Sequence, residues 1–284
     1  DDTMLMSSTL FGGLHRHNMD TLSEKYLSHN SISIKTLIGS GKTAIDFSEV
    51  PISEASNYAA EDADITLRLW FLFKKLLYTK KKINVYETLE RPLVKILAEM
   101  ELQGILVNTQ HLSAMSTRLE KNLSEIETDI HHLAEENFNL ASPKQLGEVL
   151  FVKMGLPGGK KGKNGMFSTS AEVLESLASK GVTFAEKILD WRQMSKLKST
   201  YTDALREHVN KNTNRVHTSY NISGTSTGRL SSTDPNLQNI PVRTPEGRKI
   251  REAFIAKTGF KLLSLDYSQI ELRILAHIAE IESL

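Results

Sequence analysis

The chain has 284 residues, of which 39% are hydrophobic, a composition typical of a globular protein. It contains no run of 18 apolar residues and opens with no signal peptide, so neither a membrane span nor secretion is predicted. Cysteine is absent, which excludes disulfides and thiolate zinc sites and is typical of a protein of the reducing cytoplasm.

The net charge of +1 is unevenly distributed along the chain. Residues 85–139 hold ten acidic and four basic residues. Residues 144–166 hold five lysines and one glutamate, and residues 191–215 hold six bases and two acids. Basic segments of this kind attract a phosphate backbone, although an exposed helix surface is the more common reason for them.

The first 82 residues mix helices with polar loops. An acidic segment at 20–24 predicts the start of a helix, and Gly39 and Gly41 mark a loop. Apolar residues recur at helical spacing over 51–70, which predicts a helix there. The lysine-rich segment 74–82 is predicted to be a connector that ends the first domain.

Helical patterns dominate the next part of the chain. Residues 86–103 predict an amphipathic helix capped by Gly104, with Pro92 able to kink or restart it. A short apolar run at 105–107 predicts a strand. Over 112–133 apolar residues recur every three or four positions, so one long helix is expected to protrude as half of a helical hairpin.

Capping patterns divide the segment that follows. Ser142 and Pro143 begin a helix that reaches about Met154, and a loop rich in glycine and lysine follows. The tetrapeptides at 169–172 and 183–186 read as capping boxes. They predict a helix that ends at Gly181 and a second helix that reaches Leu205.

From residue 215 the pattern changes to strands and turns. Strands are predicted at 216–222 and 254–256, with a Gly/Ser/Thr-rich loop between them. A buried strand is predicted at 261–266 and a helix at 270–282. The whole chain is therefore predicted to be a multi-domain α+β protein.

The most specific pattern is the twelve-residue string LLSLDYSQIELR at 262–273. Asp266 ends an apolar strand, where a carboxylate is costly unless a cation lies beside it. Two divalent ions held there could activate a 3′-hydroxyl and stabilise departing pyrophosphate. A lone aspartate before a helix more often serves as its N-cap, and that alternative stays open for Asp266.

This string resembles motif A of the bacterial family A DNA polymerases almost residue for residue. The resemblance implies that Asp266 binds both magnesium ions. It implies that Glu271 is the steric gate, which crowds the sugar 2′ position and rejects ribonucleotides. It also places Gln269 near the minor groove of the template-primer.

A polar loop at 225–241 carries an arginine and several amides, side chains that suit the acceptors of the DNA minor groove. A solvated surface loop would have the same composition. The string resembles the same family, which implies that Arg229 contacts the primer-terminal base. The resemblance further implies template-primer contacts for Asn236, Gln238 and Asn239, and a place near the incoming triphosphate for Arg243.

Residues 196–201, KLKSTY, resemble the thumb helix of this family. The resemblance implies sequence-independent contacts with DNA phosphates by Lys196, Lys198, Ser199 and Thr200. Without it, the segment would be interpreted as an ordinary exposed helix face. The loop with Lys160, Lys161 and Lys163 looks like the tip of the thumb.

Tyr58 and Asp62 are four residues apart and so share one helix face. The string YAAEDAD resembles the third motif of proofreading 3′–5′ exonucleases, which implies that Tyr58 orients the attacking water and Asp62 binds a metal. The alternative is a packed tyrosine beside exposed acids. Gly41-Lys42-Thr43 imitates a P-loop, but Thr36 stands where that motif needs glycine, so ATP binding is not predicted.

Together the resemblances cover the chain. They imply the C-terminal part of a ribonuclease H-like exonuclease domain at 1–82, a helical thumb with its preceding helix at 83–214, and the start of an antiparallel palm at 215–284. The implied protein is a cytoplasmic, monomeric, magnesium-dependent DNA polymerase that takes primer-template DNA and deoxynucleoside triphosphates, serves replication and repair, and proofreads.

Two expectations limit this interpretation. The chain lacks an initiator methionine and stops within a predicted helix, so we expect an internal piece that is inactive alone, because the second palm carboxylate and the first two exonuclease motifs would lie outside it. The alternatives are a non-catalytic nucleic-acid-binding module, which would not need Asp266 or Glu271, and a nuclease alone, which would not explain residues 215–284.

Overall fold

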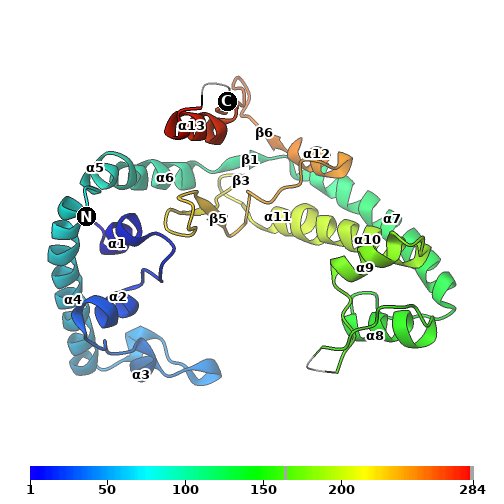
Figure 1. Ribbon diagram of the computed structural model, residues 1–284, viewed down its shortest axis with the longest axis horizontal. Coiled ribbons are helices and arrows are strands. Elements are labelled where there is room, and N and C mark those ends of the chain that lie inside the picture. The colour runs from blue at the N-terminus through cyan, green and yellow to red at the C-terminus, as the bar shows by residue number, and fades with distance from the viewer. Residues whose placement is uncertain (163–164, 282–284) are drawn as a thin grey trace. The chain divides into compact units, whose positions relative to one another are not determined.

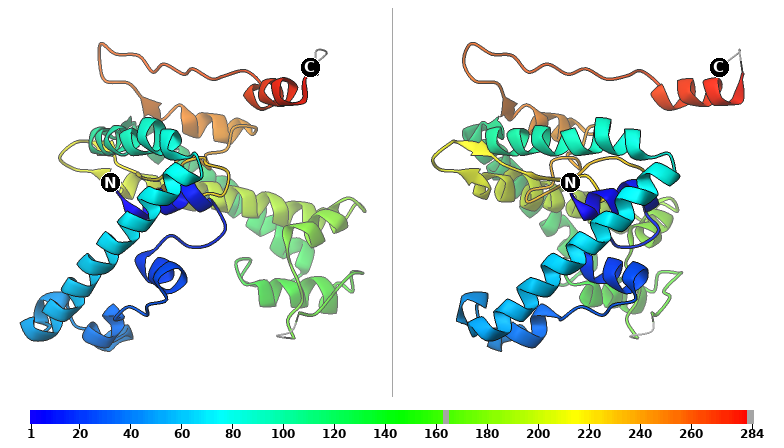
Figure 2. Two further views of the ribbon diagram at one scale, coloured as in Figure 1. Left: turned by 60° about the vertical axis from the view of Figure 1, so that its left-hand side comes forward. Right: turned by 90° about the vertical axis from the view of Figure 1, so that its left-hand side faces the viewer.

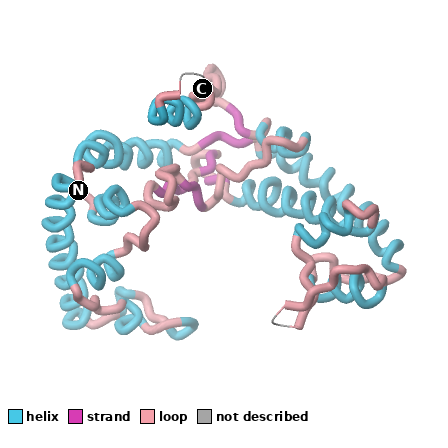
Figure 3. The backbone as a smooth tube through the Cα atoms, in the orientation of Figure 1, coloured by secondary structure: helices cyan, strands magenta, loops and turns pink. Residues whose placement is uncertain are grey.

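The structure is a computed structural model that describes residues 1–162 and 165–281. The chain divides into two compact units, which are described separately. The first comprises Asp1–Gly104 and Lys196–Val242, and the second comprises Ile105–Ser195 and Arg243–Leu284. Helices make up most of both units and the strands are short (Figure 3).

In the first unit the long helix α4 (Ile52–Thr79) is the central element, and α1 (Thr3–Phe11) and α2 (Met19–Leu27) pack against it (Figures 1 and 2). Short helical segments lie between α2 and α4, including α3 (Ile34–Ile38). The apolar stripe of α4 is fully buried and forms one cluster with α1 and Tyr86. The buried members are Leu5, Met6, Leu10, Leu22, Ile65, Leu69, Phe73, Leu77 and Tyr86.

The helix predicted at 51–70 is therefore longer than expected. Phe73 and Leu77 continue the buried stripe, so the helix extends to Thr79 and only residues 80–82 connect it to the next element. Lys74 and Lys75 lie within α4 rather than in a connector. The prediction that the whole of 74–82 is a connector was wrong because its apolar residues, not its lysines, determine the local structure.

A short helix α5 (Ile83–Val85) and a π-helical turn (Tyr86–Glu90) precede α6 (Arg91–Gln103). Glu90 and Arg91 keep right-handed helical backbone angles, so the helix continues from the π-helical turn through Pro92, and the predicted restart at this proline was wrong. Gly104 ends α6 with φ +58°, and its N–H donates to the carbonyl of Met100, as the predicted cap requires.

The rest of the first unit continues past the end of α10 (Thr183–Leu197) through a π-helical turn (Lys198–Asp203) and α11 (Ala204–Glu207). Two antiparallel hairpins follow. Strand β2 (Val209–Asn210) pairs with β3 (Arg215–Val216), and β4 (Ser219–Asn221) pairs with β5 (Ser231–Thr233). The strand predicted at 216–222 is thus divided between two hairpins.

In the second unit, β1 (Ile105–Val107) pairs antiparallel with β6 (Phe254–Ile255), as Leu106 opposes Ile255. The helix α7 (Thr109–Ala134) confirms the long periodic helix. It shares an apolar cluster with α10, and Lys187 of α10 forms an ion pair of 2.7 Å with Asp129 of α7. Between them in the chain come α8 (Pro143–Glu148), a π-helical turn (Val149–Lys153) and α9 (Ala171–Ala178).

These elements share the core of the second unit, which includes Ile130, Leu146, Leu150, Leu174 and Ile188. The predicted capping box at 169–172 was wrong, since α9 begins at Ala171 and its N-cap, Ser170, makes no side-chain cap. The Arg192 guanidinium instead donates to the carbonyl and hydroxyl of Thr169, at 2.5 and 3.2 Å. A tertiary partner has therefore taken the hydroxyl that a local cap would use.

The end of the described chain contains α12 (Pro245–Arg251) and α13 (Ile270–Ala279). The buried strand predicted at 261–266 was wrong: the segment has no regular structure, and Leu263 is 81% exposed. A strand needs a neighbour that pairs with its backbone groups, and none of the strands within 1–162 and 165–281 does so. None of the described helices is long and apolar enough to cross a membrane.

Candidate functional site

Tyr58 and Asp62 lie on consecutive turns of α4, and both are half-buried. Burial raises the pKa of Tyr58, and the charge of Asp62 and a hydrogen bond with its carboxylate raise it further. The Phe47 ring lies edge-on to Tyr58, with 5.9 Å between the ring centroids. The helix therefore brings the two predicted side chains together, and they interact.

One carboxylate oxygen of Asp62, Oδ1, is buried and has no hydrogen-bond partner. The next residue back, Glu61, has a different environment: its oxygens accept from the backbone N–H of Ile32 at 2.6 Å and lie 2.7 Å from His29 Nε2. These contacts, that of Ile32 first, lower the pKa of Glu61. Glu61 thus anchors a loop, whereas Asp62 presents an unsatisfied anionic oxygen that suits a cation.

The residues predicted to hold DNA phosphates begin at the end of α10 and continue into the π-helical turn. Lys196, Ser199 and Thr200 are exposed there. Lys198 is half-buried, and its Nζ lies 2.8 Å from Asp203 Oδ2, so part of its charge is balanced within the protein. Three of the four predicted side chains therefore face solvent, and the fourth also serves an internal ion pair.

The loop between β4 and β5 carries Arg229, which is exposed. The Thr225 hydroxyl donates to the carbonyl of Arg229 at 2.7 Å, and Gln238 Nε2 donates to the carbonyl of Leu230 at 2.9 Å. These bonds fix the backbone at Arg229 and at the residue that follows it. Gln238 thus takes part in holding the loop as well as being a predicted DNA contact.

Asn236 has a similar double role. Its Oδ1 accepts the backbone N–H groups of Gln238, at 2.9 Å, and of Asn239, at 3.2 Å, which closes a turn. The hydroxyl of Tyr201 donates to the carbonyl of Asn239, and burial raises the pKa of Tyr201. The first unit therefore brings the predicted amides and Arg229 into one hydrogen-bonded segment that the helical residue Tyr201 supports.

Asp266, Gln269 and Glu271 belong to the second unit and are all exposed. Gln269, with φ +52°, is the N-cap position of α13, and no side chain caps this helix. The alternative role of Asp266 as a helix cap is therefore excluded. Glu271 lies in the first turn of α13, and Arg273 Nε donates to the carbonyl of Ser268 at 3.0 Å, which closes the loop before the helix.

Arg243 also lies in the second unit, just before α12, and is exposed. Its carbonyl accepts a hydrogen bond from Arg248 Nη1 at 3.4 Å. Within 1–162 and 165–281, no group of three or more histidine, aspartate or glutamate side chains is arranged to hold a metal ion. Asp266 and Asp62 are therefore single candidate ligands, and only Asp62 carries a buried unsatisfied oxygen.

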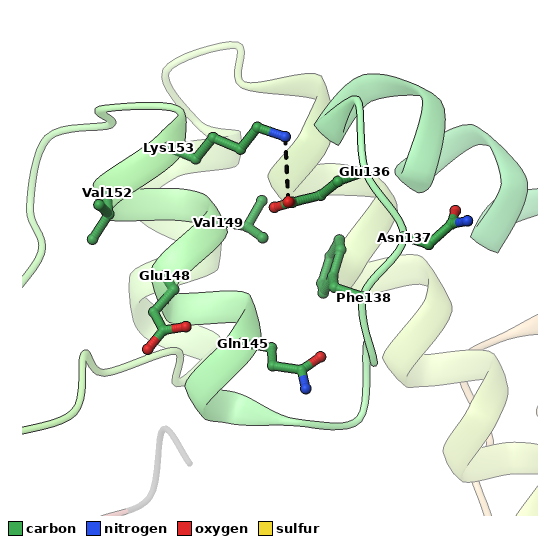
Figure 4. A pocket seen from close by; sticks show the side chains of 8 residues that line it. All are labelled: Glu136, Asn137, Phe138, Gln145, Glu148, Val149, Val152 and Lys153. Atoms are coloured by element: carbon green, nitrogen blue, oxygen red, sulfur yellow. Dashed lines mark ion pairs between the residues drawn. The ribbon is translucent and has the colours of Figure 1, made fainter.

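The predicted thumb tip is only partly described, because Lys163 lies outside the described residues. Lys160 and Lys161 are exposed, and Lys161 Nζ lies 4.9 Å from the centroid of the Phe167 ring. A pocket of about 630 Å³ lies in the same unit, where the loop after α7 faces α8 and the π-helical turn (Figure 4). An ion pair of 3.5 Å between Lys153 and Glu136 crosses it, and none of the predicted site residues lines it.

The sequence reasoning missed Glu101, which holds the strand that leads into the Arg229 loop. Its Oε1 accepts the backbone N–H of Tyr220 at 2.6 Å, and its carbonyl lies 2.7 Å from His217 Nδ1. Nothing in the local pattern around Glu101 distinguishes it from the other acids of α6. Only the tertiary contact with β4 reveals its role.

Comparison with known proteins supports the two resemblances independently. The family model described as DNA polymerase family A matches residues 109–284, and the model described as 3′-5′ exonuclease matches residues 2–78. A DNA polymerase I of Rhizobium leguminosarum is 58% identical over the whole chain, which covers 28% of that protein. A DNA polymerase I of Pseudomonas aeruginosa is 48% identical, again over the whole chain and over 31% of that protein.

A solved structure, the POL domain of Pol1 from M. smegmatis in complex with DNA primer-template and dNTP, superposes with a TM-score of 0.79. It is 32% identical to this chain, and the match covers 98% of the chain and 45% of that structure. The chain spans about three tenths of the length of the curated relatives described above. The family match and these identities show that the chain belongs to DNA polymerase family A.

Proposed function

We propose that the protein containing this chain is a DNA-directed DNA polymerase that adds deoxynucleotides to a primer 3′-end and proofreads with a 3′–5′ exonuclease. The match of residues 109–284 to DNA polymerase family A, with Asp266 and Glu271 standing in the expected string, carries the proposal. The relative from M. smegmatis was solved with primer-template and a dNTP, which supports these substrates.

Asp266 is the proposed ligand of the polymerase metal ions, which we propose to be Mg²⁺. A second carboxylate, outside this chain, would complete the proposed site. Two divalent ions, when bound, activate the primer 3′-hydroxyl and stabilise the departing pyrophosphate. Asp266 supports this role because it is exposed and does not cap α13. Glu271, one turn further on, would limit the space at the sugar 2′ position and so exclude ribonucleotides.

Arg229, Asn236, Gln238, Asn239 and Gln269 would contact the minor groove of the template-primer. Its acceptors are present in every base pair, so these side chains could test the shape of a pair without reading its sequence. Arg243 would bind the incoming triphosphate. The exposed residues Lys196, Ser199 and Thr200, with Lys198, would hold backbone phosphates.

Asp62 is the proposed exonuclease metal ligand, and its buried unpaired oxygen supports that role. Tyr58, which interacts with Asp62, would orient the attacking water. We assign 1–82 to the C-terminal part of the exonuclease domain, 83–214 to the thumb with its preceding helix, and 215–284 to the start of the palm. A non-catalytic DNA-binding module remains the rival function, since it would keep the basic thumb without needing Asp266.

Primer extension by the intact protein separates these two functions. We expect Asp266→Ala to abolish Mg²⁺-dependent extension of a primed template while binding of the primed template is retained. The control is Asp190→Ala, which removes an exposed acid of α10 and should leave extension unchanged. Extension by Asp266→Ala at the rate of the unmodified protein would support the binding module and refute the polymerase assignment.

A further inference from the structure

Thr225 stabilises the backbone of the Arg229 loop through a hydrogen bond within the loop. Thr225 Oγ1 donates to the carbonyl of Arg229 at 2.7 Å and lies 3.3 Å from Thr227 Oγ1. Ser226 is the residue between these two threonines. A displacement of Ser226 would therefore move Thr225 and, through the hydrogen bond, the backbone that carries the Arg229 side chain.

Ser226 lies directly against the segment that follows α1, within the same unit. A Cβ atom built on Gly13 would be 2.5 Å from Ser226 Cβ and 3.2 Å from Ser226 Cα. Real Cβ atoms essentially never come as close as the first of these distances. The φ of Gly13 is not left-handed, so its backbone does not require glycine. Only the close approach of Ser226 does.

A second contact holds the same loop to the same part of the chain. Ile222, at the start of the loop, packs against the apolar cluster formed by α1 and α4. Glu101 fixes the strand just before it through the N–H of Tyr220. The loop is thus held at Ser226 by Gly13 and at Ile222 by a cluster whose buried members, except Tyr86, lie within 2–78, the range that matches the 3′-5′ exonuclease model.

We infer that the exonuclease part of the chain positions the primer-contact loop of the polymerase, with Gly13 as a positioning residue for synthesis. The inference rests on the proposed function of Arg229 at the primer terminus. Gly13 and Ser226 are both exposed, yet an added methyl at position 13 would come within 2.5 Å of Ser226 Cβ, so Ser226 or the segment that carries residue 13 must shift by roughly an ångström. Misplacement on that scale lowers rates that depend on precise alignment.

The test measures how well the intact protein distinguishes a matched from a mismatched primer terminus. The primers carry a 3′-terminal phosphorothioate linkage that resists excision, so that only extension is compared. We expect Gly13→Ala to lower the ratio of matched to mismatched extension at least about tenfold. A merely structural role would lower both rates together and leave this ratio unchanged.

Rescue provides the decisive comparison. Because Ser226→Gly removes the Cβ that meets the new methyl, Gly13→Ala/Ser226→Gly should recover the ratio to within about twofold of Ser226→Gly alone. Leu14→Ala, at a neighbouring side chain that is 78% exposed, is the matched control and should change nothing. The inference is overturned if Gly13→Ala leaves the ratio unchanged, or if Ser226→Gly does not reverse the loss. The second criterion also decides the case in which Gly13→Ala alone fails to fold.

A separate variant tests the proposed function on which the inference rests. Arg229→Ala, assayed beside the others, should lower the same ratio if Arg229 reads the terminal base pair. If Arg229→Ala has no effect while Gly13→Ala is damaging and rescued, the loop is positioned as inferred and the role proposed for Arg229 is wrong. If only Arg229→Ala is damaging, that role holds and the positioning by Gly13 is refuted.

Discussion

Asp62 and Asp266, the two candidate metal ligands, differ in how firmly this chain fixes their positions. Asp62 belongs to α4, whose apolar stripe is buried, and one of its own oxygens is buried without a partner. Asp266 lies in an exposed segment without regular structure, between Leu265, which is 84% exposed, and Tyr267. A carboxylate on a packed helix is already held in position before a cation binds. The position of a carboxylate on an exposed segment, whose backbone pairs with no strand, depends on what else covers that segment.

The largest expected effect separates the two carboxylates by reaction. In the intact protein Asp62→Ala should lower 3′–5′ excision by about 10³-fold or more, because a metal ligand is lost, and leave primer extension unchanged. The measurement is digestion of a labelled single strand beside extension of a primed template. Asp64→Ala is the control, since this acid pairs only at the surface with Arg68. Undiminished excision by Asp62→Ala would show that the buried oxygen holds no catalytic metal.

The packing around the two sites can be compared with one type of substitution. Leu69→Ala removes a fully buried side chain of α4 and should lower the free energy of unfolding by about 3 kcal/mol. Leu263→Ala, in the exposed segment before Asp266, should change it by less than about 0.5 kcal/mol. Denaturant unfolding of the 284-residue chain measures both. Equal losses would contradict the contrast between a packed and an unpaired region.

Glu271→Ala tests the role proposed for Glu271 in the exclusion of ribonucleotides. Removing the side chain proposed to crowd the sugar 2′ position should reduce discrimination against ribonucleotides by about 100-fold, while deoxynucleotides are still incorporated. The ratio of kcat/KM for a deoxynucleotide and its ribonucleotide, measured with the intact protein, reports this. Glu280→Ala, at the other end of α13, serves as the control. Unchanged sugar selectivity would remove Glu271 from the nucleotide site.

The smallest expected effect concerns the loop that Glu61 anchors next to Asp62. Glu61→Gln should lower the local free energy of opening at Ile32 by about 1 kcal/mol at pH 7, because a charged acceptor is lost. The folded-state pKa of Glu61 is lowered, chiefly by Ile32, so the carboxylate stabilises the loop above its ordinary pKa. That stabilisation is lost as the pH falls through the lowered value.

Hydrogen exchange of the peptide around Ile32, corrected for intrinsic rates, measures this effect. The unmodified protein and Glu61→Gln should differ by about fivefold at pH 7 and converge once the carboxylate is protonated. A difference that persists in acid would assign the effect to packing rather than to charge.

Local patterns predicted the helices of this chain well and its tertiary partners poorly. The seam of α7 and the cap at Gly104 could be read from the sequence because spacing and backbone freedom are local properties. The sequence at 169–172 matches a capping box, yet the hydroxyl of Thr169 accepts a hydrogen bond from Arg192, 23 residues away. The sequence of segment 261–266 is typical of a strand, but the segment pairs with no strand in the described part of the chain.

The candidate site shows the same division. The positions of Tyr58 and Asp62 on one helix face followed from their spacing, and the helix places them together. The contacts that shape the Arg229 loop, from Glu101 and Gly13, involve residues more than 100 positions away and leave no trace in the local sequence. Side-chain type can thus indicate chemistry, while the support of a loop is visible only in three dimensions.

Counting the metal ions bound at the polymerase site tests the role of Asp266 as a metal ligand. Manganese binding to the intact protein, with primer-template and a dNTP that cannot be incorporated, can be followed by electron paramagnetic resonance in an Asp62→Ala background. About two ions per polymerase site are expected, and at least about one fewer after Asp266→Asn. An equal number of ions bound with equal affinity in both proteins would show that Asp266 is not a metal ligand.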